Sequence, residues 1–327
     1  MNNLLKKIIR FILKIFWIFP MRDSKGFFMC FDGKVCGFDS KALAEYFLEN
    51  CKESYELYWA TKEKGFLRGA IPGIRLVKQK SFAGLYHMMT AEIFIFDINP
   101  PSYIPYRKKQ ILINTWHGYA YKKCGKYLEN FDAAQHNLAT CYTSYSKQYS
   151  DAVLSDSFCY KGTILKCGAP RNDIFFKDDL RKRGEIIKRE IGIDADQNVL
   201  LYAPTFRGEF SFEDSQLDFQ GLKTALLKRF GGEWVILCRL HPLIANRGGF
   251  ADGLYINVSE YPDMQNLLAA ADILITDYSS SQWDFGLMRR PVFLFAPDFN
   301  DYKVSRGFLY PIEEIPFPIA ISNEMLL

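Results

Sequence analysis

Short apolar runs alternate with helix-length segments along most of this chain, and this alternation limits the possible folds more than any other feature. The runs are rich in β-branched and aromatic residues, and they are apolar on both faces instead of alternating with polar residues. Strands that are buried on both faces and separated by helices are typical of parallel sheets made from βαβ units. The sequence therefore predicts an α/β protein.

The apolar runs fall into two series with a charged stretch between them. They cover residues 26–32, 55–61, 74–77, 91–97, 111–116, 138–144 and 163–168, and then 198–205, 233–242, 254–257, 272–277 and 291–297. The charged stretch "KDDLRKRGEIIKREIGID", residues 177–194, has apolar residues at helical spacing and is typical of a linker helix. We therefore expect two doubly wound, Rossmann-like domains, 23–173 and 174–327, that face each other across a cleft.

The N-terminal stretch "LLKKIIRFILKIFWIFP", residues 4–20, predicts a separate element. Its basic residues are Lys6, Lys7, Arg10 and Lys14. At about 100° per residue these charges fall within one arc of about 100°, and apolar residues fill most of the remainder. So many charges make a poor membrane span and interrupt the core of a signal peptide. We expect residues 1–22 to form an amphipathic helix, ended by Pro20, on the cytoplasmic membrane surface; a helix packed on the protein's own body is the alternative.

Composition and missing motifs argue against several function classes. The net charge is only +4, and the aromatic residues are not interleaved with a basic stripe, so a nucleic-acid partner is not expected. The eight cysteines include no C-x-x-C pair and no zinc spacing, which is typical of reduced thiols. There is no G-x-G-x-x-G, no G-x-x-x-x-G-K-[ST] and no D-x-D at a strand end. We therefore expect neither a cofactor nor a bound metal.

Unusual polar residues gather where the predicted strands end. His117 follows "ILINTW", and Arg207 comes after "VLLYAP". Arg239 and His241 follow "WVILC", and residues 277–281 follow "DILIT". Because the carboxyl ends of parallel strands form the functional edge of such a sheet, we expect these clusters to converge on one cleft. For His117 the sequence alone leaves two readings open, a reacting group or a core residue.

The basic residues of the second series suit a phosphate-bearing ligand. Arg239 and His241 are two residues apart and lie on the same side of an extended chain, where they would stabilise charge on a phosphoryl group. Arg207 offers a fork of donors that matches phosphate oxygens. A satisfied structural histidine and a surface ion pair are the alternatives. We interpret His87 and His136 as structural, because neither has a partner pattern.

The segment "ITDYSSSQWDFG", residues 275–286, adds a predicted helix start near Ser281. Ser279 and Ser280 just precede it, so their hydroxyls and the free backbone N–H groups suit a phosphate. Asp284 stands three residues after Ser281, at the spacing of a capping box, and is either a cap or a hydrogen-bond acceptor for a ligand. A plain helix cap is the alternative for the whole segment.

These pieces, in this order, resemble the CDP-glycerol glycerophosphotransferase family, which makes teichoic acids and related phosphodiester-linked capsule polymers. The resemblance covers about residues 90–315 and is carried by "TWHG", "GAPRND", "YAPTFR", "RLHP", "ITDYSS", "PVFLFAPD" and "RGFLY". It implies a GT-B architecture, with the active site between two Rossmann-like domains. It also implies peripheral attachment to the cytoplasmic face of the membrane.

The resemblance implies a role for each matching residue. His117 corresponds to the catalytic base, and His241 to a second essential histidine at the diphosphate. Positions that contact the donor phosphate or nucleotide are implied or expected at Arg207, Arg239, Asp277, Ser279, Ser280 and Asp284. Gly118 leaves room for a close approach. Lys122 and Lys123 are expected to contact an anionic acceptor, with a solvated helix face as the alternative.

The expected activity is transfer of glycerol phosphate, or a related polyol phosphate, from a CDP-activated donor. The acceptor is a hydroxyl of a lipid-linked sugar or of a growing teichoic-acid or capsule polymer, and CMP is released. One alternative is a GT-B glycosyltransferase or epimerase that uses a UDP-sugar. Another is an inactive membrane-bound scaffold of a capsule assembly complex, because this chain ends at "ISNEMLL", where family members usually continue with helices. The "YAY" after "WHG" also departs from the small residues or proline common there.

Overall fold

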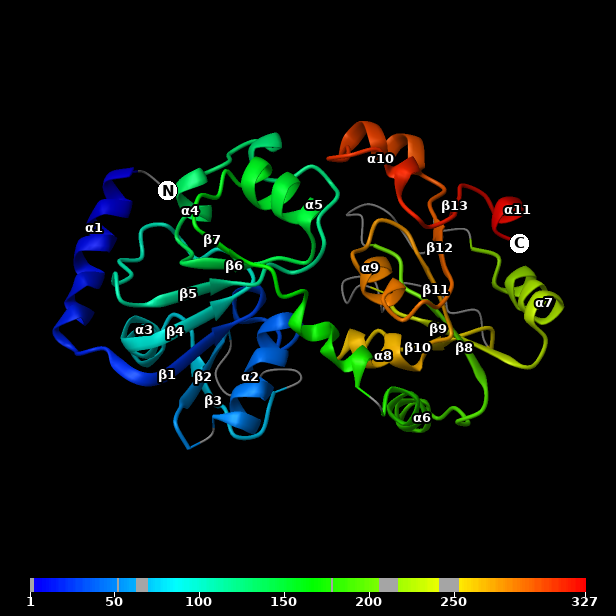
Figure 1. The fold of residues 1–327 in the computed structure, drawn as a ribbon, viewed down its shortest axis with the longest axis horizontal. Helices are drawn as coiled ribbons and strands as arrows, with labels where there is room; N and C mark the ends of the chain where they lie inside the picture. The colour runs from blue at the N-terminus through cyan, green and yellow to red at the C-terminus, as the bar shows by residue number, and fades with distance from the viewer. Residues whose placement is uncertain (1–2, 52, 63–69, 178, 206–216, 241–252) are drawn as a thin grey trace. The chain divides into compact units, whose positions relative to one another are not determined.

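The computed structural model describes residues 3–51, 53–62, 70–177, 179–205, 217–240 and 253–327. The chain divides into two compact units, Met1–Arg171 and Asn172–Leu327. Each unit contains one parallel sheet with helices around it (Figure 1). The α/β fold with parallel strands that the alternating pattern predicted is thus confirmed.

The first unit contains a seven-stranded sheet with the order β3-β2-β1-β4-β5-β6-β7, in which every pair is parallel. Its strands are β1 (Arg22–Met29), β2 (Glu56–Thr61), β3 (Arg75–Lys78), β4 (Ala91–Phe96), β5 (Ile111–Asn114), β6 (Cys141–Thr143) and β7 (Thr163–Leu165). The strand order reverses between β1 and β4. In doubly wound sheets, ligands bind beyond the carboxyl ends of the strands at such a reversal.

The helices of the first unit lie between these strands along the chain, except for α1, which precedes β1. They are α1 (Asn3–Leu13), α2 (Phe38–Asn50), α3 (Phe82–Thr90), α4 (Ala133–His136) and α5 (Lys147–Tyr149). Tighter 3₁₀ turns cover Lys14–Ile18, Phe31–Gly33 and Gly125–Tyr127, and a π-helix covers Ser150–Ser157. Ser81 caps α3, because its side chain accepts a hydrogen bond from the backbone N–H of Gly84 at 3.1 Å. In the core, the rings of Phe28 and Trp59 stack with their centroids 5.7 Å apart.

The second unit contains a six-stranded sheet with the order β10-β9-β8-β11-β12-β13, again with every pair parallel. Its strands are β8 (Asn198–Tyr202), β9 (Trp234–Cys238), β10 (Ile256–Asn257), β11 (Ile273–Thr276), β12 (Val292–Phe295) and β13 (Ile319–Ala320). The described helices are α6 (Leu180–Glu190), α7 (Phe219–Phe230), α8 (Met264–Ala270), α9 (Ser281–Gly286), α10 (Phe299–Ser305) and α11 (Asn323–Leu326). The order reverses between β8 and β11, so this sheet repeats the winding of the first.

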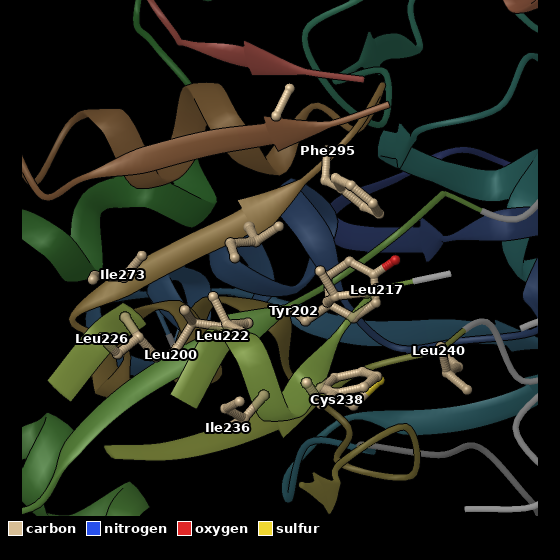
Figure 2. Close-up of a cluster of buried hydrophobic side chains, with 13 residues drawn as sticks. Leu200, Tyr202, Leu217, Leu222, Leu226, Ile236, Cys238, Leu240, Ile273 and Phe295 are labelled. Carbon is tan, nitrogen blue, oxygen red and sulfur yellow. The ribbon is translucent and has the colours of Figure 1, made fainter. Parts of the chain in front are cut away.

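Apolar side chains from neighbouring strands of the second sheet meet helix α7 in one buried core. Figure 2 shows Leu200, Ile236 and Ile273 on the sheet and Leu222 and Leu226 on the helix. All of them are at most 4% exposed. Gly231 directly follows the last residue of α7. Its φ of 70° lies in the left-handed region, which glycine adopts more readily than other residues.

The charged stretch 177–194 contains α6, as its helical spacing predicted, but this helix packs within the second unit. Gly184 faces α8 so closely that a Cβ atom there would lie 2.9 Å from the carbonyl oxygen of Ala269. The side chain of Arg183 donates to Asn266 at 3.2 Å. Since the glycine admits a close helix–helix contact, α6 is an integral part of the second unit and more than a linker.

Candidate functional site

His117 lies on a sharp turn directly after β5. Trp116 has a φ of 54°, in the left-handed region that non-glycine residues rarely adopt, and Gly118 has a φ of 147°. The buried side chain of Asn114 holds the turn, because its Oδ1 accepts the backbone N–H of Trp116 at 2.7 Å. The Trp116 ring then stacks on the imidazole with a centroid distance of 4.3 Å. Backbone strain of this kind is typical of functional sites, where surrounding contacts maintain it.

A backbone hydrogen bond fixes the protonation pattern of His117. Its Nδ1 lies 3.1 Å from the carbonyl oxygen of Asp97. Because a carbonyl can only accept, Nδ1 carries the proton and the Nε2 of the neutral ring keeps its lone pair. Burial lowers the pKa of His117, and this effect outweighs the hydrogen bond to Asp97, which raises the pKa; the positive charges of Arg171 and Lys122 lower it further. The partly exposed ring is therefore neutral near pH 7 and suited to accept a proton.

Asp97 connects His117 to the point where the order of the first sheet reverses. It follows β4 and is fully buried, and its carboxylate accepts the backbone N–H of Phe31 at 2.9 Å and the thiol of Cys30 at 3.0 Å. Burial raises the pKa of Asp97 to about 6. Through its carbonyl, the same residue holds the imidazole. Sequence reasoning gave Asp97 no role; its place at the end of "AEIFIFD" was the available signal.

A buried ion pair supports the His117 turn from another side. Arg171 donates to Asp39 through its backbone N–H at 2.9 Å and through Nη1 at 2.5 Å, and both side chains are buried. The hydroxyl of Tyr145 lies 3.1 Å from the Asp39 carboxylate and 2.6 Å from the carbonyl oxygen of Thr115. Through Tyr145, the ion pair is thus linked to Thr115, two residues before His117. Arg171 belongs to the motif "GAPRND", but no local pattern of the sequence indicates a role for it or for Asp39.

In the second unit, Asp277 closes the junction between the ends of β8 and β11. Its carboxylate accepts the backbone N–H of Thr205 at 2.9 Å, the hydroxyl of Thr205 at 2.5 Å and the backbone N–H of Tyr278 at 2.5 Å. The residue is 2% exposed. Because these donors belong to the protein, the carboxylate of Asp277 fixes the loop that carries Ser279 and Ser280.

Helix α9 begins at Ser281, where the sequence predicted a helix start. The prediction of a capping box formed by Ser281 and Asp284 is wrong. Ser280 is the N-cap residue and makes no side-chain capping bond, while Ser281 donates to the hydroxyl of Ser279 at 3.0 Å. The buried carboxylate of Asp284 accepts from the amides of Asn172 at 2.7 Å and Gln265 at 3.0 Å. Asp284 therefore anchors α9 to other parts of its unit.

The remaining predicted site residues divide between described and undescribed parts of the chain. Arg239 follows β9, is partly buried, and donates its backbone N–H to Tyr202 at 2.9 Å. Lys122 is close enough for its charge to act on His117, whereas Lys123 is exposed. Arg207 and His241 lie outside the described residues.

Within each unit, several of the described candidates lie at or just beyond the carboxyl ends of parallel strands. This holds for His117 and Gly118 after β5, and for Arg239, Asp277 and the serines after β9 and β11. Over the ranges that the structure describes, no group of three or more His, Cys, Asp or Glu side chains is placed to hold a metal ion.

Comparison with known proteins places this chain in a family. The family model described as CDP-Glycerol:Poly(glycerophosphate) glycerophosphotransferase matches residues 11–327. A teichoic acid poly(glycerol phosphate) polymerase of Bacillus subtilis (strain 168) is 29% identical over 99% of this chain, which spans only 46% of that relative's length. A polymerase of the same description from Bacillus spizizenii (strain ATCC 23059 / NRRL B-14472 / W23) is 28% identical, with 100% of this chain and 88% of the relative covered.

A solved structure extends this likeness to the fold. It is a variant of the wall teichoic acid polymerase TagF soaked with CDPG, and it superposes with a TM-score of 0.85 at 26% identity. The alignment covers 98% of this chain and 83% of the TagF chain. The family model covers nearly the whole sequence, and the fold agrees over nearly the same range. The chain belongs to the CDP-glycerol:poly(glycerophosphate) glycerophosphotransferase family.

Proposed function

We propose that this protein transfers glycerol phosphate from CDP-glycerol to a hydroxyl of a growing teichoic-acid polymer and releases CMP. The observation that carries the proposal is the family match over residues 11–327, together with a neutral histidine on a strained turn at a strand end. Teichoic acid poly(glycerol phosphate) polymerases are among the relatives, and the similar TagF structure was soaked with CDPG. A lipid-linked sugar as first acceptor belongs to the same proposal.

The proposed reaction is an in-line displacement at the β-phosphorus of the donor. The Nε2 of His117 accepts the proton of the acceptor hydroxyl, whose oxygen forms a new bond to the β-phosphorus. The bond from that phosphorus to the bridging oxygen breaks, and CMP leaves with the electron pair. Phosphoryl transfer depends mainly on positioning and on charge stabilisation, for which a fixed base and cations at the strand ends are suited.

We further propose that residues of the second unit bind the donor, in a GT-B arrangement of residues 23–173 and 174–327. Arg239, Ser279 and Ser280 would hold its phosphates, with Arg207 and His241 from outside the described residues. Asp277 and Asp284 would position the serine loop, because their carboxylates already accept hydrogen bonds from the protein. Gly118, Lys122 and Lys123 would lie on the acceptor side.

The donor assignment is tested with a panel of nucleotides. We expect CDP-glycerol to raise the midpoint of thermal unfolding and to yield CMP when a teichoic-acid acceptor is added, whereas UDP-sugars do neither. Stabilisation by UDP-sugars alone would overturn the proposed donor in favour of a glycosyltransferase or epimerase. Stabilisation by no nucleotide would favour the scaffold alternative.

We also propose that the N-terminal segment attaches the protein to the cytoplasmic face of the membrane. Helix α1 and the following 3₁₀ turn expose apolar side chains that a soluble surface rarely gathers. Those at least 47% exposed are Leu4, Leu5, Ile8, Phe11, Ile12, Ile15 and Ile18. None of the helices in the described ranges combines the length and the apolar character needed to cross a bilayer. An interfacial helix is the form of attachment that fits both observations.

This attachment predicts that the double substitution Phe11→Glu/Ile15→Glu lowers partitioning onto vesicles about a hundredfold or more. Each bulky apolar side chain contributes about 1.5–3 kcal/mol when it leaves water, and the new carboxylates oppose insertion. Flotation with liposomes measures the effect. The control Leu227→Glu/Val304→Glu changes two side chains that are similarly exposed, at 60% and 90%, and should float like the parent protein. Equal loss in both variants, or in neither, would contradict the attachment.

A further inference from the structure

A hollow lies beside the N-terminal segment and has no part in the chemistry described above. Its volume is about 920 Å³, within the range of small-molecule sites. Its lining includes Trp17, Asp23, Glu92, Arg107, Lys108 and Lys109. Arg107, Lys108 and Lys109 belong to the loop that enters β5, at the edge of the sheet opposite to His117. We call it the basic hollow.

Two of its cations are available to a ligand. Lys108 and Lys109 are exposed, and the structure gives neither of them a hydrogen-bonding or ionic partner among the described residues. Arg107 is already engaged, because its Nη2 donates to the carbonyl oxygens of Phe16 at 2.7 Å and Phe19 at 2.6 Å. Arg107 therefore shapes the hollow, whereas the two lysines face whatever occupies it.

Glu92, one of the two carboxylates that line the basic hollow, is held in place by hydrogen bonds within the protein. Glu92 accepts the backbone N–H of Ser24 at 2.8 Å and the hydroxyl of Tyr55 at 3.1 Å. Three cations, Arg107, Lys108 and Lys109, thus line the hollow together with two carboxylates, Asp23 and Glu92. The groups that face the hollow therefore favour an anion, with room for a hydroxyl or amine beside Asp23.

The rim of the basic hollow joins the apolar surface of the N-terminal segment. Trp17 lines the hollow, is 44% exposed, and donates its indole N–H to the carbonyl oxygen of Pro105 at 2.8 Å. Its sequence neighbour Ile18 and nearby Ile15 are 72% and 61% exposed. Tryptophan with one polar and one apolar side is typical of the headgroup level of a bilayer. An anion site at this place would lie at the depth of lipid phosphates.

We propose that the basic hollow binds the headgroup of an anionic phospholipid, with Lys108 and Lys109 on its phosphate. The inference rests on the proposed membrane attachment and adds to it a lipid class and a site. Charge selects an anionic phospholipid over a neutral one, because neither lysine has a partner within the part of the chain that the structure describes. Ile15 and Ile18, exposed neighbours of Trp17 in the sequence, favour a phosphate that carries acyl chains over a free one.

The first experiment compares vesicles of phosphatidylcholine with and without phosphatidylglycerol. Lys108→Gln/Lys109→Gln should lower binding to the phosphatidylglycerol vesicles about thirtyfold, since a basic residue at an anionic surface contributes about a factor of five. Binding to pure phosphatidylcholine should not change. Lys182→Gln/Lys228→Gln removes the same charge from exposed lysines of the second unit and should leave both values unchanged. Equal binding by parent and Lys108/Lys109 variant on both vesicles would overturn the proposal.

The second experiment separates a built site from diffuse attraction to a charged surface. Dihexanoyl phosphatidylglycerol, kept below its micelle concentration, should bind the parent protein in calorimetry and should not bind the Lys108/Lys109 variant. Absence of binding to the parent would overturn the site even if vesicle binding falls. Equal binding of glycerol 3-phosphate would overturn the lipid assignment, because it would show a site for free phosphate esters.

Failure of the proposed lipid site can be distinguished from failure of the proposed transferase activity and from failure of the proposed membrane attachment. CMP release with a soluble acceptor should be the same in the parent and in the Lys108/Lys109 variant, because the hollow lies away from His117. Loss of that activity would contradict the separation of the two sites. If Phe11→Glu/Ile15→Glu keeps full vesicle binding, the membrane attachment fails by itself, whatever the monomeric lipid does.

Discussion

Replacing His117 with alanine is expected to lower the rate of CMP release from CDP-glycerol about a thousandfold, within the range of about 10²- to 10⁴-fold for loss of a general base. The reason is that the Nε2 lone pair, which the bond from Nδ1 to the Asp97 carbonyl leaves free, would be lost. Single-turnover measurement of CMP with a teichoic-acid acceptor gives the rate. The thermal unfolding midpoint shows whether the variant remains folded.

The substitution His117→Asn separates chemistry from architecture. The asparagine amide can still donate to the Asp97 carbonyl in place of Nδ1, but it has no counterpart of a basic Nε2. We expect it to fold like the parent protein and to be as slow as the alanine variant. Near-parental turnover in folded His117→Asn would show that the histidine serves only to hold the turn, and the proposed base would have to be found elsewhere.

The substitution Arg171→Met should destabilise the protein by about 3–5 kcal/mol, the usual cost of removing one partner of a buried ion pair. The fully buried Asp39 would then keep its charge without the guanidinium that accompanies it in the native state. Denaturant unfolding, followed by a probe in the first unit, measures the loss.

A double substitution tests the physical reason for this loss. In Arg171→Met/Asp39→Leu no buried charge remains, so much of the lost stability should return even though the ion pair is absent. Lys147→Met breaks the exposed pair between Lys147 and Asp151 and should have little effect, because solvent screens that pair. If the double variant is as unstable as Arg171→Met, packing of the Arg171 side chain, and not uncompensated charge, explains its importance.

The sequence predicted the parallel sheets well, because burial on both faces leaves a strong local signal in runs such as 91–97 and 272–277. Short edge strands were harder to find. The second series of runs stopped at residue 297, and β13 was missed because two residues carry no periodicity. The run 138–144 contains a strand of only three residues, since tertiary pairing with β5 and β7 decides its limits.

The candidate site was predictable only where strand ends carry unusual residues. His117 was identified in this way. The residues that support it were not, because their roles depend on contacts between distant parts of the chain: Arg171 and Asp39 are 132 positions apart. Asp277 and Asp284 were predicted as ligand-binding groups from their positions. No local pattern could show that Thr205, Asn172 and Gln265 already donate to their carboxylates.

The N-terminal segment is held through carbonyl oxygens of the main chain, and this has an evolutionary consequence. Arg10 donates to the oxygens of Ser102 and Ile104, Trp17 to that of Pro105, and Arg107 to those of Phe16 and Phe19. Every residue has such an oxygen, so the anchor constrains the identity of few side chains. The outward-facing positions can therefore change in sequence, or be redesigned, while the helix keeps its place.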